Sequence, residues 1–440
     1  MIVMKFGGTS VGSAERIKGV YNIVKLFMNK KPVVVVSAVG GITDKLINAA
    51  NNAKNGEDYE SILNEIYQKH KTILKDLNLN ENMINHLLDE FSELINKIAK
   101  TKETNKEIMD LVQSFGERMS VRIVAAYFSA QGTKSKAFDA FDIGMITDSN
   151  FGSAEPLESS PAEIKKAFSK IKELPIVTGF IGKDTAGTIT TLGRGGSDYT
   201  GAIIGAAIGC EEIQIWTDVS GIMTSDPRIV KNPKTLEHVS FAEASELAYF
   251  GAKVLHPKTI LPAMKKNIPV KVLNSFAPTG KGTTIVNKEQ PTKEIIKAIA
   301  TKKGVTIINI NSLRMLFSYG FLAKIFNVFE DYQKSVDMIS TSEVSVSLTV
   351  DNDENLQKIV DELKEIADIK VERNNAIVCL VGAGMFHAKG LAGRIFTTLG
   401  KNNINIEMIS QGASEINVSL VVKQEDADKA MQVLHQEFFG

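Results

Sequence analysis

The chain has 440 residues, more than one ordinary hydrophobic core accommodates, so two or more domains are expected. Hydrophobic residues make up 43% and charged residues 23% of the sequence, which is typical of a soluble globular protein. Lysine plus arginine and aspartate plus glutamate each number 51, so the formal net charge is zero, and neither nucleic acid nor a membrane is expected as a partner.

The compartment is predicted from the cysteines and the N-terminal residues. Cys210 and Cys379 each lie in an apolar run and lack metal-ligand spacing, as expected in a reducing compartment. The first residues do not have the layout of a signal peptide, and no apolar stretch is long enough to span a bilayer. We therefore expect a cytoplasmic protein.

Two short apolar segments near the N-terminus each end in glycine. MIVMKFGGTS places Lys5 just before its glycines, and PVVVVSAVGG places Ser37 at the end of a β-branched run. Such runs are typical of buried parallel strands, whose carboxyl ends form the ligand edge of α/β proteins. The sequence contains no GxxxxGK[ST] motif, so a P-loop is excluded and several strand ends must build the site.

The next segment changes in composition. Residues 51–112 contain few glycines and no proline, which predicts a helical insert or lid with mostly solvated charges. QSFGERMSVRIVAAYFSAQG is then predicted to form a helix that carries Glu117 near its start. A single helical glutamate is most often a surface residue, so this position alone does not indicate a function.

Residues 187–228 contain the strongest indication of a ligand. A β-rich segment leads into a glycine turn with Arg194, Ser197 and Asp198, then a helix beginning at TGAIIGAAIG and the buried strand EEIQIWTDV. A glycine turn before a helix N-terminus can bind an anion, because the backbone approaches closely and the helix offers free N–H groups. A glycine cluster alone is often a structural turn, but three polar side chains in it favour a ligand site.

The C-terminal part contains an internal repeat. Ile325–Ser340 aligns with Ile395–Ser410, and Glu343–Val350 aligns with Glu415–Val422. Two copies of a small ββαββα-type unit suggest a paired sensing module.

Other candidate sites are weak. AIVCLVGAGMFHAKG looks like a dinucleotide motif, but His387 stands at the third glycine. The histidines are scattered, so neither a metal cluster nor a Ser-His-Asp triad is indicated.

Six ordered motifs carry a resemblance to a known family: KFGGTS, SFGERMS, TTLGRGGSDYTGA, WTDVSGIMTSDPR, FGAKVLHP and SVDMISTSEVSVSL. The chain resembles the aspartokinases, and most of all their monofunctional, lysine-regulated branch. The resemblance implies an α/β amino-acid-kinase domain over 1–285, with a mostly parallel sheet between helices. It further implies a regulatory region over 297–440 with two ββαββα-type ACT domains. These would cover about 304–370 and 376–440, either in succession or interleaved.

The implied activity is ATP-dependent phosphorylation of the L-aspartate side-chain carboxylate to 4-phospho-L-aspartate, the first step toward lysine, threonine and methionine. Lys5 would neutralise the transferring phosphoryl group, and Asp198 would orient Lys5. Glu117 would receive the substrate α-ammonium, and Arg194 would clamp its α-carboxylate. The other substrate contacts implied are Ser37, Thr43, Gly195, Gly196 and Ser197. Those implied for the nucleotide are Lys5, Gly7, Gly8, Ser10, Thr217, Asp218, Arg228 and Lys253.

The resemblance also implies Mg²⁺ held mainly by the phosphates of ATP, with no protein metal site. L-lysine would be the effector, bound to a homodimer formed through the ACT domains. Asp337 and Glu343 would supply the two carboxylates that a doubly ammonium-bearing ligand requires. The implied effector positions are Met315, Ser318, Phe321, Leu322, Ser335, Val336, Asp337, Ser342 and Glu343.

Two alternatives remain at this point. One is another kinase of the same fold, acting on glutamate, acetylglutamate or carbamate. The other is a catalytically inactive amino-acid sensor. The lack of a catalytic histidine fits a kinase that acts on a carboxylate, because that nucleophile is already ionised near neutral pH.

Overall fold

A computed structural model describes residues 1–251, 255–287, 295–316, 319–385, 388–411 and 416–440. The chain forms two compact units. The first comprises Met1–Ile222, Glu237–Phe241 and Val254–Lys288, and the second Met223–Leu236, Ala242–Lys253 and Glu289–Gly440. Two segments that precede residue 285 in the chain therefore pack with the C-terminal unit. The domain limits at 285 and 297 remain a prediction.

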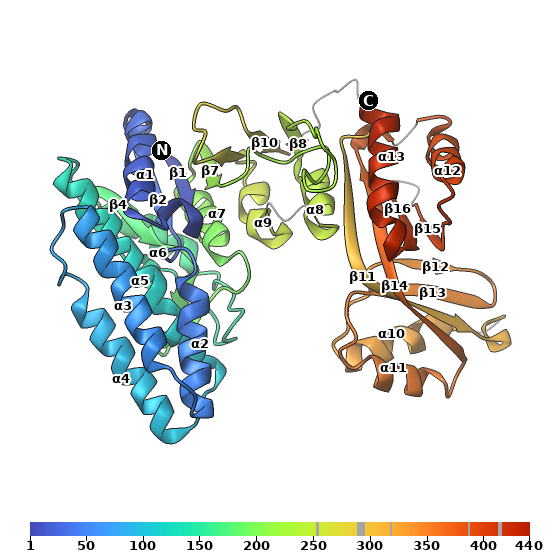
Figure 1. The fold of residues 1–440 in the computed structure, drawn as a ribbon, viewed down its shortest axis with the longest axis horizontal. Helices are drawn as coiled ribbons and strands as arrows, with labels where there is room; N and C mark the ends of the chain where they lie inside the picture. Colours follow the sequence, from blue (N-terminus) through green and yellow to red (C-terminus); the bar gives the residue numbers. More distant parts are fainter. Residues whose placement is uncertain (252–254, 288–294, 317–318, 386–387, 412–415) are drawn as a thin grey trace. The chain divides into compact units, whose positions relative to one another are not determined.

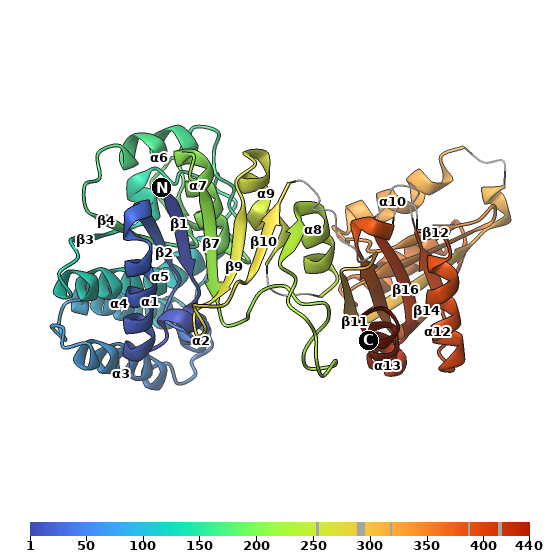
Figure 2. The same cartoon turned by 90° about the horizontal axis from the view of Figure 1, so that it is seen from above.

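An eight-stranded sheet forms the centre of the first unit, in the order β3-β4-β2-β1-β7-β9-β10-β8. The first six of these strands pair in parallel, whereas β10 is antiparallel to β9 and parallel to β8. Figure 2 shows β2, β1, β7, β9 and β10 side by side in that order. The strands are β1 (Ile2–Phe6), β2 (Pro32–Val36), β3 (Ser135–Phe138), β4 (Leu174–Thr178), β7 (Glu212–Thr217), β8 (His238–Ser240), β9 (Val270–Asn274) and β10 (Thr283–Val286), with a separate hairpin of β5 (Ile181–Lys183) and β6 (Ile189–Thr191).

The side chains of β1 alternate between two helical layers, as the two-residue period of a strand requires. Ile2, Met4 and Phe6 are fully buried in the core that α1 and α5 share. Lys5 faces the other side, where helix α7 packs against the strand. The side chain of Lys5 therefore lies on the face of the sheet that α7 covers.

The first unit contains the predicted helical insert, but the insert does not end where the sequence predicted. Helices α2, α3, α4 and α5 pack together, as Figure 1 shows. The predicted limit at residue 112 is wrong in detail, because α5 already begins at Lys106 and Glu117 lies near its middle. The helices are α1 (Ala14–Leu26), α2 (Ile42–Asn55), α3 (Glu60–Asp76), α4 (Asn85–Thr101), α5 (Lys106–Ala130), α6 (Ser160–Phe168), α7 (Gly196–Ile208) and α9 (Pro257–Lys265). Helix α8 (Phe241–Tyr249) belongs to the second unit from Ala242 onward.

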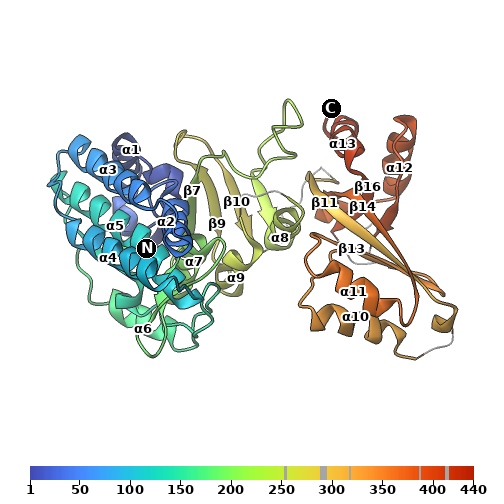
Figure 3. The same cartoon turned by 60° about the horizontal axis from the view of Figure 1, so that its bottom comes forward.

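The second unit contains a six-stranded antiparallel sheet in the order β12-β13-β11-β14-β16-β15. The long strands β11 and β14 pair along their length and belong to both repeats. Figures 1 and 3 show α10 and α11 at one end of these strands and α12 and α13 at the other. Its elements are β11 (Ala298–Asn311), α10 (Phe321–Asp331), β12 (Ile339–Thr341), β13 (Ser345–Val350), α11 (Leu356–Leu363), β14 (Asp368–Val381), α12 (Leu391–Lys401), β15 (Met408–Ser410), β16 (Asn417–Lys423) and α13 (Ala427–Phe439).

The two repeats are interleaved. The core of the C-terminal copy takes Ile299 from the first half of β11, together with α12 and α13. The core of the N-terminal copy takes Ile308 and Ile310 from the second half of the same strand, together with α10 and α11. One long strand thus completes both copies.

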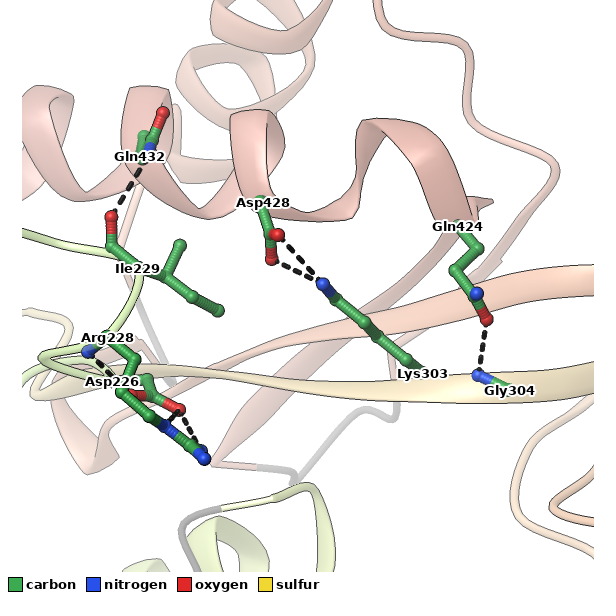
Figure 4. A network of polar contacts seen from close by, with 8 residues as sticks. All are labelled: Asp226, Arg228, Ile229, Lys303, Gly304, Gln424, Asp428 and Gln432. Atoms are coloured by element: carbon green, nitrogen blue, oxygen red, sulfur yellow. Dashed lines mark hydrogen bonds and ion pairs between the residues drawn. The ribbon is translucent and has the colours of Figure 1, made fainter.

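Lys297, directly before β11, and Lys303, within it, have contrasting partners. The ammonium of Lys297 lies 2.8 Å from the Glu243 carboxylate of α8, with side chains 4% and 0% exposed. Glu243 also accepts the backbone N–H of Ala383. Lys303 instead binds Asp428 of α13 at 2.8 Å, with side chains 43% and 49% exposed. Figure 4 shows this second pair.

We expect Lys297→Met to lower the free energy of unfolding by about 3–5 kcal/mol, because it removes the cation that neutralises a buried carboxylate. Lys303→Met is the matched control, with a loss of about 1 kcal/mol or less for a solvated pair. Urea unfolding followed by circular dichroism measures both. Equal losses in the two variants would contradict the assignment of Lys297 to a buried pair.

Candidate active site

A pocket of about 550 Å³ lies where β1, β2 and the glycine turn end. Its lining contains all of the residues predicted to bind substrate, together with both predicted catalytic residues and Gly8. These are Lys5, Gly8, Ser37, Thr43, Glu117, Arg194, Gly195, Gly196, Ser197 and Asp198. Segments far apart in sequence therefore meet in one cavity.

The ammonium of Lys5 lies 2.6 Å from the Asp198 carboxylate, with side chains 10% and 14% exposed. Lys5 comes from the α7 side of β1, and Asp198 from the first turn of α7. A carboxylate in this turn is favoured by the positive end of the helix dipole. The helix begins at Gly196, earlier than the TGAIIG segment from which it was predicted, so Ser197 and Asp198 are helical.

The turn before α7 depends on backbone conformations that favour glycine. Gly195 has φ +72°, which a side chain would strain. Gly179 lets Ser197 pack against the backbone, since a Cβ there would lie 2.5 Å from the Ser197 hydroxyl. Arg194 is exposed, and its guanidinium has no hydrogen bond or ion pair within the described ranges. The turn therefore presents a free cation beside the pocket.

Glu117 is the second pocket residue with an unpaired polar atom among the residues described. Its side chain is buried, and Oε1 accepts the backbone N–H of Ala38 at 3.1 Å. Oε2 is buried without a hydrogen-bond partner among the residues described. Burial is the main cause that raises the pKa of Glu117 to about 8. A buried oxygen without a partner is costly, and a cationic ligand in the pocket would relieve that cost.

Asp110, which sequence reasoning missed, holds one wall of this pocket. Its buried carboxylate accepts the hydroxyl of Thr191 at 2.7 Å and the backbone N–H groups of Thr191 and Gly152 at 2.8 and 2.9 Å. Thr191 and Gly152 both line the pocket. Asp110 lies two helical turns before Glu117 on α5, and the two residues share one face of the helix. This spacing was the sequence signal that could have placed Asp110 near the site.

Comparison with known proteins agrees with this geometry. Residues 1–274 match the amino acid kinase family, and residues 378–438 match the ACT domain. Lysine-sensitive aspartokinase 3 of Escherichia coli K12 is 38% identical over all of this chain and 99% of that protein. The chain belongs to the aspartokinase family. The resemblance found in the sequence and the fold class are thereby confirmed.

Two further similarities extend the comparison. Chloroplastic aspartokinase 1 of Arabidopsis thaliana is 42% identical to this chain, across 99% of it and 80% of the plant protein. The crystal structure of E. coli aspartokinase III with aspartate and ADP has a TM-score of 0.87 and 36% identity, with full coverage of both chains.

The predicted nucleotide residues fall into two groups. Gly7 donates its backbone N–H to the Trp216 carbonyl at 3.1 Å. The Ser10 hydroxyl lies 2.8 Å from that of Ser275, which donates to the Thr217 carbonyl at 3.0 Å. These contacts join the carboxyl ends of β1, β7 and β9, and Asp218 follows them on the surface.

Arg228 does not belong to that group. It lies in the second unit, where its guanidinium binds the Asp226 carboxylate and its side chain is 80% exposed. The pocket lining does not include it. Lys253 lies outside the described residues.

The predicted effector residues lie in the N-terminal repeat. Met315 ends a short helix before α10, and Leu322 is exposed at the start of α10. Phe321 is a core residue at 7% exposure. Ser335 and Val336 precede β12, Ser342 follows it, and Ser318 lies outside the described residues.

Asp337 and Glu343 are not brought together within one chain. They lie at opposite ends of β12, and an extended stretch of that length separates them by up to roughly 20 Å. Glu343 is exposed, whereas the Asp337 side chain is only 1% exposed and pairs with Lys302. The hypothesis that both carboxylates serve one ligand therefore requires a second chain.

Among the described residues, no helix has the length and apolar character needed to cross a bilayer. The same residues contain no group of three or more His, Cys, Asp or Glu side chains placed to hold a metal ion.

Asp110→Asn should loosen the pocket wall, because an amide cannot accept from three donors as the carboxylate does. We expect a loss of about 1–3 kcal/mol in stability and faster hydrogen exchange at the Gly152 and Thr191 amides. Exchange measured by mass spectrometry on the folded enzyme tests both. Unchanged protection of these two amides would remove Asp110 from this role.

Proposed function

We propose that this chain is a lysine-regulated aspartokinase that transfers the γ-phosphoryl group of ATP to the side-chain carboxylate of L-aspartate. The observation that carries the proposal is the composition of the pocket. It combines the Lys5–Asp198 ion pair with a free guanidinium on Arg194 and a buried carboxylate oxygen without a partner on Glu117. These groups complement the ammonium and the carboxylates of an amino acid that receives a phosphoryl group.

Each end of aspartate has a complementary group. The α-ammonium would bind Glu117, whose free Oε2 lacks a cation. The α-carboxylate would bind Arg194, because a guanidinium can donate to both oxygens at once. Ser37, Thr43 and the start of α7, from Gly195 to Ser197, would hold the rest of the substrate.

The reaction needs positioning and charge neutralisation more than proton transfer. A side-chain oxygen of aspartate attacks the γ-phosphorus, the bond to the β,γ-bridging oxygen breaks, and ADP leaves. Lys5 would offset the charge on the transferring group, and Asp198 would keep the ammonium of Lys5 in place. ATP would approach from the ends of β1 and β7, near Gly7, Ser10, Thr217 and Asp218.

We propose that Mg²⁺ enters with ATP. Its hard-oxygen chemistry needs few protein carboxylates when phosphates supply ligands. In the pocket, the Asp198 carboxylate is already beside Lys5, and Glu117 accepts a backbone N–H. This arrangement fits a metal held mainly by phosphate oxygens, which neutralises charge on the nucleotide when bound.

Regulation by L-lysine is supported by the similarity to lysine-sensitive aspartokinase 3 of E. coli and by the ACT match. We propose that lysine binds the N-terminal repeat. The separation of Asp337 from Glu343 along β12 supports a site shared between two protomers of a homodimer. A cytoplasmic location is part of the same proposal.

The alternatives fit the pocket less well. Acetylglutamate and carbamate lack the α-ammonium that the buried Glu117 oxygen would receive. Glutamate carries that ammonium but is one methylene longer than aspartate. A catalytically inactive sensor would have no need of the Lys5–Asp198 pair, which is intact.

A hydroxamate assay tests the function directly, because hydroxylamine traps an acyl phosphate as a coloured product. We expect turnover with ATP and L-aspartate, little with glutamate or acetylglutamate, and inhibition by lysine but not threonine. Lys5→Ala should lower kcat by about 10²–10³, as expected when a charge-stabilising group is removed. Lys30→Ala, at a half-exposed ion pair, is the control. Near-normal turnover of Lys5→Ala would exclude Lys5 from the mechanism.

The raised pKa of Glu117 gives a pH dependence. Below its pKa of about 8 the free enzyme holds a neutral carboxyl, which cannot pair with the substrate ammonium. The value of kcat/KM for aspartate should therefore rise roughly ten-fold between pH 7 and 9, as this group ionises. Glu117→Gln should lose the rise and most of the affinity for aspartate. A flat wild-type profile over this range would contradict the assignment.

A further inference from the structure

The carboxylate of Asp337 is already occupied. Its Oδ1 accepts the ammonium of Lys302 at 2.8 Å and the hydroxyl of Tyr249 at 2.5 Å. The side chain is 1% exposed although the neighbouring strand β12 is exposed. Its Oδ2 is buried and has no hydrogen-bond partner among the described residues. Asp337 is therefore a buried anion that is only half satisfied.

Lys302 presents the same chemistry as one end of the proposed effector. It is a primary ammonium on an alkyl chain, held against a carboxylate and 4.8 Å from the centre of the Tyr249 ring. Its side chain is 20% exposed, so the pair is largely removed from solvent. An internal lysine from the first half of β11 thus holds the carboxylate of the N-terminal repeat at which an external lysine is proposed to bind.

A single carboxylate does not neutralise two ammonium groups. An effector ammonium that approaches the free Oδ2 would either displace Lys302 or share Asp337 with it, close to a like charge. Both outcomes reduce the affinity for the effector, because the internal cation must be moved or repelled. The structure also offers Lys302 an alternative partner, since Asp351 Oδ2 lies 3.7 Å away and that side chain is 41% exposed.

We propose that Lys302 is an internal competitor for the effector carboxylate and sets the lysine concentration at which the enzyme is inhibited. This inference rests on the proposed regulation by lysine and adds a residue that opposes effector binding. It accounts for a buried carboxylate that keeps one oxygen open while the other is held by a cation from its own chain.

Tyr249 extends the competition to helix α8. It is the last residue of that helix, and α8 follows β8 of the catalytic sheet directly in the chain. The hydroxyl of Tyr249 donates to the same Oδ1 as Lys302. An effector that takes over Asp337 would therefore also compete with the hydrogen bond that ties the end of α8 to the repeat.

The test is a lysine titration of the kinase reaction with the full-length enzyme. Lys302→Met removes the internal cation and keeps the length of the side chain. We expect its half-inhibitory lysine concentration to fall about ten-fold, the order of effect of a charge-assisted hydrogen bond. Basal kcat and the KM for aspartate should stay close to wild type. Calorimetric titration with lysine should show the same increase in affinity.

Two controls isolate the charge at this position. Lys302→Arg keeps a cation and should stay within about three-fold of the wild-type half-inhibitory concentration. Lys303→Met removes the adjacent lysine, which binds Asp428 instead (Figure 4), and should leave the half-inhibitory lysine concentration unchanged. If Lys302→Met does not give folded enzyme, Tyr249→Phe tests the same competition. This variant removes a neutral donor and should lower the half-inhibitory concentration about three-fold.

The outcomes separate this inference from the proposal on which it rests. A wild-type enzyme that lysine does not inhibit would overturn the proposed lysine regulation itself. A wild type that lysine inhibits, with unchanged or weaker inhibition of Lys302→Met, would overturn the competitor role alone. The same holds for Tyr249→Phe where that variant is the one measured.

Discussion

The ion pair between Lys5 and Asp198 is the constraint on which the catalytic unit depends. It joins the first strand of the chain to the first turn of a helix almost two hundred residues later. Two features make this contact possible. The alternation of β1 directs Lys5 away from the α1 and α5 layer, and the glycine turn starts α7 early enough to place Asp198 over the strand end. A charge held this way needs little reorganisation when a phosphoryl group arrives.

Three other buried carboxylates differ in their hydrogen-bond and ion-pair partners, and these partners indicate different roles. Asp110 has three donors, so its role is to hold backbone. Glu243 is paired with Lys297 deep in the second unit, where it ties α8 to the start of β11. Glu117 keeps one oxygen without a partner and faces a pocket. Because burying an open carboxylate oxygen is costly, the last arrangement is the one that indicates a ligand.

Much of the catalytic unit could be predicted from sequence because its information is local. Strand ends that finish in glycine, and a glycine turn before a helix, indicated a ligand site from local sequence alone, and Ser37 and Arg194 from these segments line the pocket. Thr43 also lines it, but that position was predicted only from the family resemblance. Other features depend on contacts between distant segments. Asp110 is an ordinary helical acid until Thr191 and Gly152 fold onto it. The burial of Asp337 likewise depends on Lys302 and Tyr249, which no local pattern connects.

The two regulatory repeats share a backbone arrangement and differ in the environment of one acid. Asp337 and Glu407 occupy matching positions, since the N–H of each bonds to the facing strand, at Thr349 and Val421. Glu407 lies 3.8 Å from Lys423 with its side chain 22% exposed, whereas Asp337 is nearly inaccessible and bound at 2.8 Å. Glu407 also accepts the side-chain amide of Asn405 at 3.0 Å, so a neutral donor holds this acid and it depends less on its cation. A buried acid must keep a cation at all times, so replacing that cation can change the structure around it. Lys302 lies in the half of the interleaved strand β11 that packs in the C-terminal copy, and it pairs with Asp337 of the N-terminal copy, so a cation from one copy holds the acid of the other.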